Sequence, residues 1–119
     1  MTQNVHFWEL LDRLVSENPL RIDRPKGSRH PHYPEMIYPV DYGYLEGTHS
    51  MDGGGIDVWR GTAQNRGVVA VIASIDHKKM DAEIKVLLDC SPSEQQTIAN
   101  FHNHSPEMQG ILLPRPEEI

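Results

Sequence analysis

Hydrophobic positions near the start of the chain recur at intervals of three and four residues, which predicts an amphipathic helix. We expect this helix over residues 4–17, ended by Asn18-Pro19. The positions of its apolar stripe are Phe7, Leu10, Leu11, Leu14 and Val15. The next segment, residues 20–35, contains three prolines and one glycine, so we expect an extended, irregular loop there.

Extended segments follow in the middle of the chain. Residues 36–45 are rich in tyrosine, and residues 55–62 and 82–88 carry the β-branched and apolar residues typical of strands. The strongest pattern lies over 67–75, where a nearly continuous apolar run predicts a strand buried on both faces, or inside a barrel backed by a helix. Residues 111–113 predict a last short strand.

A second helix is predicted after these strands. Ser91 and Glu94 have the spacing of a capping box, and Pro92 stands at the first helical position. The helix should run to about His104, with Ile98 and Phe101 facing inward. Because the strands cluster between two helices, the order of elements favours an α+β fold or a small barrel over a parallel sheet.

Length and charge narrow the class of protein. At 119 residues the chain is expected to form one domain, 1–119. A formal net charge of −6 with no basic face argues against nucleic-acid binding. No apolar run is long enough to span a membrane, and the first residues lack the pattern of a signal peptide. A single cysteine, Cys90, fits a reducing compartment, so we expect a cytoplasmic protein.

Two pairs of aspartates are the candidates for chemistry. Asp52 and Asp57 flank a run of three glycines, and Asp76 and Asp81 flank a short turn that contains two lysines. Carboxylates held close together suit Mg²⁺, and nearby lysines suit phosphate, which are the parts that metal-assisted phosphoryl transfer requires. Each pair alone is also explained by ordinary turn chemistry, and the occurrence of both pairs favours the functional reading.

The first pair follows the aromatic stretch Tyr38-Pro39-Val40-Asp41-Tyr42-Gly43-Tyr44. This stretch, with Asp52 and Asp57 after it, resembles the signature of the soluble inorganic pyrophosphatases. The second signature of that family has an aspartate, four residues, then Asp-x-Lys, and Asp76 and Asp81 match its two acids. The resemblance implies a small OB-like β-barrel of about five strands, with an N-terminal and a C-terminal helix. It also implies an enzyme that uses several Mg²⁺ ions to hydrolyse pyrophosphate.

The resemblance also implies roles for single residues. Asp52, Asp57 and Asp81 would share one metal ion, and Asp76 would face a further ion. Phosphate contacts would come from a tyrosine of the aromatic strand and an arginine upstream of that strand, with a third residue matched only loosely. These phosphate-contacting residues are Tyr42, Arg29 and, loosely, Arg21.

Three departures separate this chain from the family pattern. Gly54 stands where the family has its water-activating acid, and Glu83 stands where it has the lysine of the second signature. Ser105 and Pro106 replace a phosphate-binding Tyr-Lys pair. The loss of a general base typically reduces the rate about 10²–10⁴-fold.

Other residues could compensate for these losses. Strand periodicity places Lys85 on the same face as Asp81 and Glu83, so Lys85 is a candidate for phosphate binding. Glu46 and Asp41 are candidates for the missing base.

Two functions follow from these observations. The first is hydrolysis of a phosphoanhydride, by default pyrophosphate, dependent on Mg²⁺ or alternatively Mn²⁺, with a small phosphate compound as substrate. The second is a catalytically impaired relative that binds a phosphate ligand or regulates another protein.

Core packing explains Tyr42 as well as ligand contact does. We also expect a homo-oligomer, because Trp8 and Phe7 would form an exposed apolar face.

Overall fold

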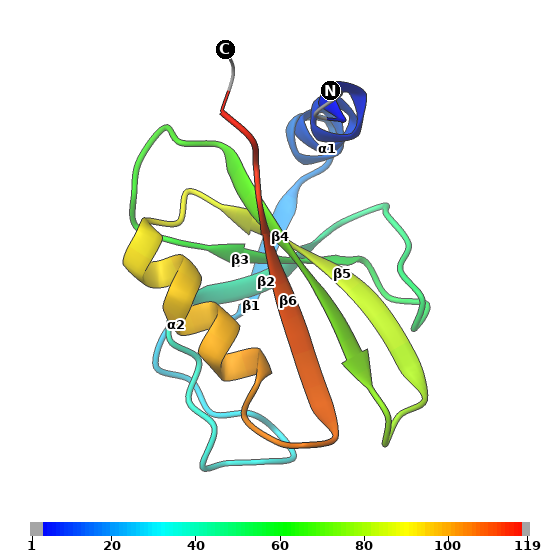
Figure 1. The fold of residues 1–119 in the computed structure, drawn as a ribbon, viewed down its shortest axis with the longest axis vertical. Helices are drawn as coiled ribbons and strands as arrows, with labels where there is room; N and C mark the ends of the chain where they lie inside the picture. Colours follow the sequence, from blue (N-terminus) through cyan, green and yellow to red (C-terminus); the bar gives the residue numbers. More distant parts are fainter. Residues whose placement is uncertain (1–3, 118–119) are drawn as a thin grey trace.

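The computed structural model describes residues 4–117, which form two helices and one mixed sheet (Figure 1). Neither helix is long and apolar enough to cross a membrane. In chain order the elements are α1 (Val5–Glu17), β1 (Leu20–Arg24), β2 (Asp41–Leu45), β3 (Ile56–Arg60), β4 (Val68–Asp76), β5 (Asp81–Leu88), α2 (Pro92–His102) and β6 (Met108–Pro114).

The sheet has the strand order β1-β2-β3-β5-β4-β6. Strands β3 and β5 run parallel, and the other neighbours run antiparallel. The predicted class, α+β and mainly β, is confirmed. The sheet has six strands where about five were expected, and it remains open, with β1 and β6 at its two edges.

The two helices pack on different hydrophobic clusters of the sheet. Trp8 and Leu11 of α1 pack with Val58 and Val86, whereas Ile98 of α2 packs with a cluster that includes Trp59. Neighbouring residues of β3 therefore belong to different clusters, as strand alternation requires. In β4, Val71 joins the α1 cluster and Ile72 joins the α2 cluster, so the predicted burial of this strand on both faces is confirmed.

The predicted irregular loop over 20–35 is wrong at its start, because residues 20–24 form β1 and pair with β2. Leu20, Ile22 and Arg24 are half-buried, and the residues between them are exposed. A five-residue edge strand with only two apolar residues gives a weak alternation signal beside so many prolines and charges. The register shifts between Ile22 and Arg24.

The β1–β2 pairing also explains the glycine between the two strand tyrosines. A Cβ atom added to Gly43 would lie 1.8 Å from the carbonyl oxygen of Arg21 and 2.8 Å from the Cα of Ile22. Only glycine allows β1 to approach β2 this closely. This glycine therefore has a structural role in positioning the edge strand.

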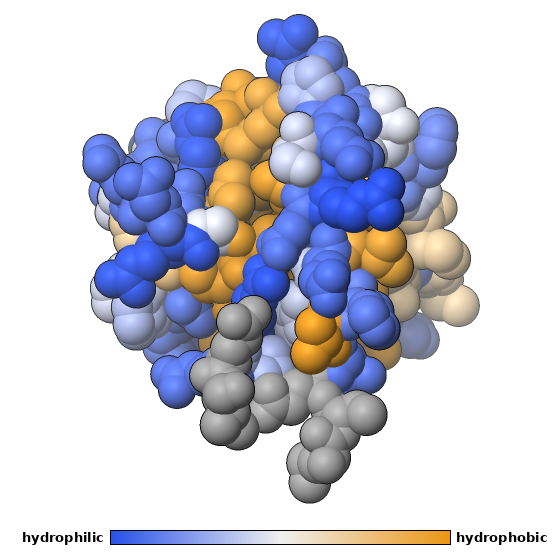
Figure 2. Space-filling model, turned by 90° about the horizontal axis from the view of Figure 1, so that it is seen from above, coloured by the Kyte–Doolittle hydropathy of each residue, from blue (hydrophilic) through white to orange (hydrophobic). Residues whose placement is uncertain are grey.

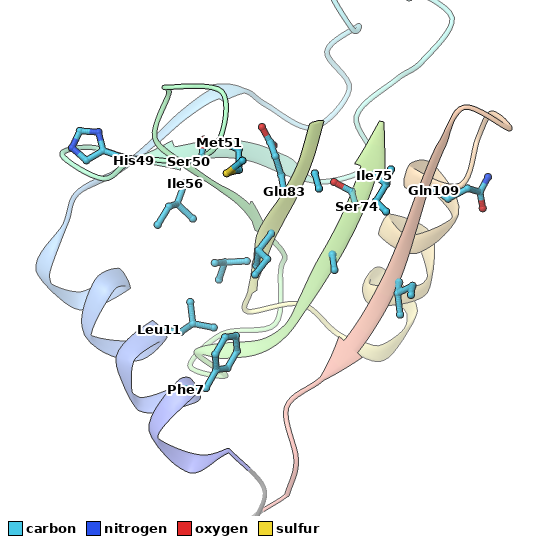
Figure 3. Close-up of a pocket in the computed structure, with 15 residues that line it drawn as sticks. Phe7, Leu11, His49, Ser50, Met51, Ile56, Ser74, Ile75, Glu83 and Gln109 are labelled. Atoms are coloured by element: carbon cyan, nitrogen blue, oxygen red, sulfur yellow. The ribbon is translucent and has the colours of Figure 1, made fainter. Parts of the chain in front are cut away.

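The exposed face predicted for α1 needs correction. Trp8 is only 7% exposed and packs on the sheet, whereas Leu10, expected in the stripe, is 58% exposed. Phe7 and Leu11 point toward the strands (Figure 3) and line an apolar hollow of about 890 Å³. Hydrophobic surface remains visible on this end of the molecule (Figure 2). Exposed apolar side chains on the strands include Ile75, Ile84, Ile111 and Leu113. Self-association stays a prediction.

A buried histidine joins α2 to the centre of the sheet. Trp59 Nε1 donates a hydrogen bond of 3.0 Å to Nε2 of His102, which is 3% exposed. Because Nε2 accepts, the ring proton of the neutral histidine lies on Nδ1, which has no partner among the described residues. Burial, aided by the charge of Lys85, lowers the pKa of His102 from 6.5 to about 3.

This histidine should make the protein sensitive to acid. The unfolded chain takes up the His102 proton near pH 6.5, but the folded chain does so only near pH 3, so stability is lost as pH falls between these values. We expect the free energy of unfolding to fall by about 2–3 kcal/mol between pH 7 and pH 4.5 from this group. Urea denaturation at several pH values measures it. In His102→Gln, which keeps an acceptor for Trp59 but does not titrate, that part of the slope should disappear. An unchanged slope would contradict the assignment.

Candidate functional site

A cavity of about 520 Å³ brings all four predicted aspartates together. Asp52 comes from the glycine turn, Asp57 from β3, and Asp76 and Asp81 from the two sides of the β4–β5 turn. Further walls come from the loop before β2 and from the end of α2. Tyr42 and Lys85, which the sequence also singled out, line the same cavity.

The glycine turn holds Asp52 in a defined position. One carboxylate oxygen, Oδ1, accepts hydrogen bonds from Ser50 Oγ at 2.7 Å and from the Gly54 N–H at 2.9 Å. These bonds lower the pKa of Asp52, since both favour the charged form. Gly53 has a φ of 86°, a conformation that favours glycine. The glycine turn thus holds the Asp52 carboxylate at the cavity wall.

The second pair lies where β4 and β5 join. Asp76 and Asp81 are directly opposite each other in the strand register. Asp76 Oδ1 accepts a hydrogen bond of 3.1 Å from the Lys79 N–H. The side chain of Asp81 makes no hydrogen bond or ion pair with any other residue of the described chain. The turn between them brings Lys78 and Lys79 to the cavity wall, as the sequence suggested.

Lys85 links Asp57 of the first pair to the buried Tyr42. Its ammonium nitrogen Nζ is 2.8 Å from Asp57 Oδ2, 2.9 Å from Glu83 Oε2 and 2.9 Å from the hydroxyl oxygen of Tyr42. An ammonium has three N–H donors, so these contacts use all of them. The residue is 8% exposed. The phosphate-binding role predicted for Lys85 stays a prediction, and its donors are engaged within the protein.

Burial and charge set the protonation of this group. Burial acts to lower the pKa of Lys85, but the oxygens of Tyr42 and Asp57 outweigh it, so the pKa is raised and the ammonium stays charged. Burial raises the pKa of the Tyr42 hydroxyl, which is therefore neutral. Burial also raises the pKa of Glu83, with Asp57 and Asp52 adding to the effect and Lys85 opposing it.

The carboxylates fit a metal ion only in part. Within residues 4–117, no three His, Cys, Asp or Glu side chains gather closely enough to enclose a metal ion. Asp57 already shares an oxygen with an ammonium. Asp76 and Asp81, by contrast, have no cationic side chain bound to them in the described chain. One or two carboxylates are enough for Mg²⁺ when phosphate and water supply the other ligands.

The cavity contains an arginine that the sequence analysis did not single out. Arg24, at the end of β1, donates a hydrogen bond to the Tyr38 hydroxyl and lies with its guanidinium 5.6 Å from the centre of that ring. Simple alternation along β1 could not have found it, because the register shifts between Ile22 and Arg24, and this shift pairs Arg24 with Tyr42 on the cavity side of the sheet. His30 and His32 also line the cavity. Burial, and then the charge of Arg24, lowers the pKa of His30.

Four other predicted residues do not line the cavity. Arg21 and Glu46 form an exposed ion pair of 2.7 Å between the end of β2 and β1. Asp41 accepts hydrogen bonds from the Lys26 N–H and from Arg60. Arg29 donates to the carbonyl oxygen of Pro34. The structure therefore brings together the acids, Tyr42 and Lys85, and places both base candidates elsewhere.

Comparison with known proteins finds similarity at the level of the fold. No family model and no curated protein sequence matches the chain. Among solved structures, an inorganic pyrophosphatase from Neisseria gonorrhoeae is similar, with a TM-score of 0.61 and 16% sequence identity. The match covers 76% of this chain and 77% of that chain. The chain therefore has a fold like that of an inorganic pyrophosphatase, which is compatible with the OB-like arrangement that the sequence predicts.

Proposed function

We propose that the protein hydrolyses a phosphoanhydride in an Mg²⁺-dependent reaction, with inorganic pyrophosphate as the default substrate. The observation that carries this proposal is the grouping of four aspartates with Arg24, Lys78 and Lys79 in one cavity of a pyrophosphatase-like fold. Acids and cations are both needed, because phosphate binds to positive groups while its magnesium ion binds to carboxylates.

In this proposal Asp76 and Asp81 hold the magnesium ion together with phosphate oxygens. Bound Mg²⁺ or Mn²⁺ would supply charge neutralisation and make an attached water more acidic. Arg24 would bind phosphate oxygens from the β1 side, where Tyr38 fixes its guanidinium. Lys78 and Lys79 would do so from the opposite turn. The substrate would thus be held between two cationic walls.

A second candidate function is binding of a phosphate ligand without efficient turnover. The specific observation in its favour is Gly54, which has no side chain where the family has its water-activating acid. Asp41 and Glu46 lie outside the cavity and are engaged in ion pairs. Such a protein would keep the Arg24 and lysine contacts and would act by binding or by regulating another protein.

The first test is release of phosphate from pyrophosphate in the presence of Mg²⁺, and then of Mn²⁺. We expect metal-dependent release that falls at least about 10²-fold in Asp81→Asn, since this change removes a carboxylate proposed to hold the metal. Glu17→Gln is the matched control, because Glu17 lies on α1 and, among residues 4–117, pairs only with Arg13. Its rate should equal that of the wild type. Absence of release by a folded protein that binds pyrophosphate would instead favour the binding function.

Restoring the missing acid is a separate test. A Cβ atom at Gly54 would meet one atom within 4 Å, Asp52 Oδ1 at 3.3 Å, so a side chain can be accommodated at modest cost. We expect Gly54→Asp to raise the rate of phosphate release about 10–100-fold, because it restores an acid at the position where the family has its water-activating residue. Gly54→Asn, of equal size but unable to take a proton, should give no increase. An equal gain in both variants would show that the acid is not the cause.

A further inference from the structure

We propose that the Lys85 ammonium is the resident cation at Asp57, in the place of the metal ion that the pyrophosphatase resemblance assigns to Asp52, Asp57 and Asp81. This inference concerns one position in the cavity. It holds whether or not the protein hydrolyses pyrophosphate, because it concerns what neutralises Asp57 in the folded chain.

The coordination of the ammonium is complete without a ligand. Three strands each contribute to it: Tyr42 from β2, Asp57 from β3, and Glu83 on the same strand as Lys85 itself. The three distances lie between 2.8 and 2.9 Å, which is normal for charged hydrogen bonds. A lysine on the surface would exchange such partners with water, but this one is 8% exposed.

The backbone fixes the ammonium where it is. Strands β3 and β5 run parallel with Val58 opposite Val86, so Asp57 and Lys85 lie side by side one residue earlier. The Lys85 Nζ also lies 5.5 Å from the centre of the Tyr42 ring. That ring packs against Trp59 with a centroid distance of 4.5 Å. The lysine is therefore part of the packed α2 side of the sheet, and cannot be withdrawn without disturbing the core.

Glu83 and Lys85, which both differ from the family pattern in where they place charge, are bound to each other. The family pattern has a lysine at the position of Glu83, next to the metal-binding end of the strand. Here the lysine stands two residues further along the strand, where the backbone is about 7 Å from the Glu83 position. The acid at Glu83 then supplies the third acceptor that the buried ammonium needs.

A divalent ion at Asp57 would compete directly with this arrangement. It would have to share the Asp57 carboxylate with Lys85, which holds Oδ2 at 2.8 Å, and it would lie beside a buried positive charge. Both effects weaken metal binding, because like charges repel strongly where water is excluded. Asp76 and Asp81, at the β4–β5 turn, have no such cation bound to them among residues 4–117.

Binding of Mn²⁺ tests the inference without any measurement of activity. Titration followed by electron paramagnetic resonance would compare the wild type with Asp57→Asn, whose amide oxygen can still accept from Lys85. We expect the two affinities to agree within about threefold, whereas a loss of about tenfold or more in Asp57→Asn would overturn the inference. No detectable Mn²⁺ binding by the wild type would agree with the inference and would count only against the proposed Mg²⁺-dependent reaction.

Removal of the ammonium gives the converse test. In Lys85→Met, of similar length and without charge, we expect a new Mn²⁺ site at least about tenfold tighter than any site of the wild type. The double variant Lys85→Met with Asp57→Asn should lose it. A folded Lys85→Met protein that gains no site would contradict the inference. If Lys85→Met does not fold, the wild type and Asp57→Asn comparison decides.

Discussion

The hydrogen bonds of the Lys85 ammonium are the constraint on which the candidate site depends. A charge removed from water must find partners, and here these partners come from Tyr42, Asp57 and Glu83. Removal of one partner of a buried ion pair typically costs about 3–5 kcal/mol. Because Tyr42 also packs on Trp59, the same contacts hold the polar cavity and the hydrophobic core in one arrangement.

The two faces of the sheet differ in the kind of hollow that they carry, polar on one and apolar on the other. On the α2 side, packed aromatic rings give way to the acids and cations of the cavity. On the α1 side, the helix covers only part of the sheet and leaves an apolar hollow. The fold is like that of an inorganic pyrophosphatase, yet the charges in the cavity are arranged differently from that family's signature. Fold similarity alone therefore does not fix the chemistry of the cavity.

The features predicted well from the sequence are those set by neighbouring residues. Within each acid pair the connection is local: a glycine turn follows Asp52, and a tight turn joins Asp76 to Asp81. The capping box at Ser91 is likewise local, and its two hydrogen bonds are present. The sequence did not reveal Arg24, because residues 20–24 form a strand through their pairing with β2. The contact of Lys85 with Asp57 could not be predicted, because it depends on the parallel pairing of β3 with β5 and joins residues 28 positions apart.

The state of the Lys85 ammonium is the most direct test of this account. Nuclear magnetic resonance of ¹⁵N-labelled protein can detect a lysine ammonium group whose protons exchange slowly with water. We predict one such signal at neutral pH, absent from Lys85→Arg, that keeps its chemical shift as Mg²⁺ is added. The exposed Lys26, Lys78 and Lys79 should exchange too fast to give comparable signals. Loss of the protected signal on addition of Mg²⁺ would show that the metal displaces the ammonium, and would contradict the account.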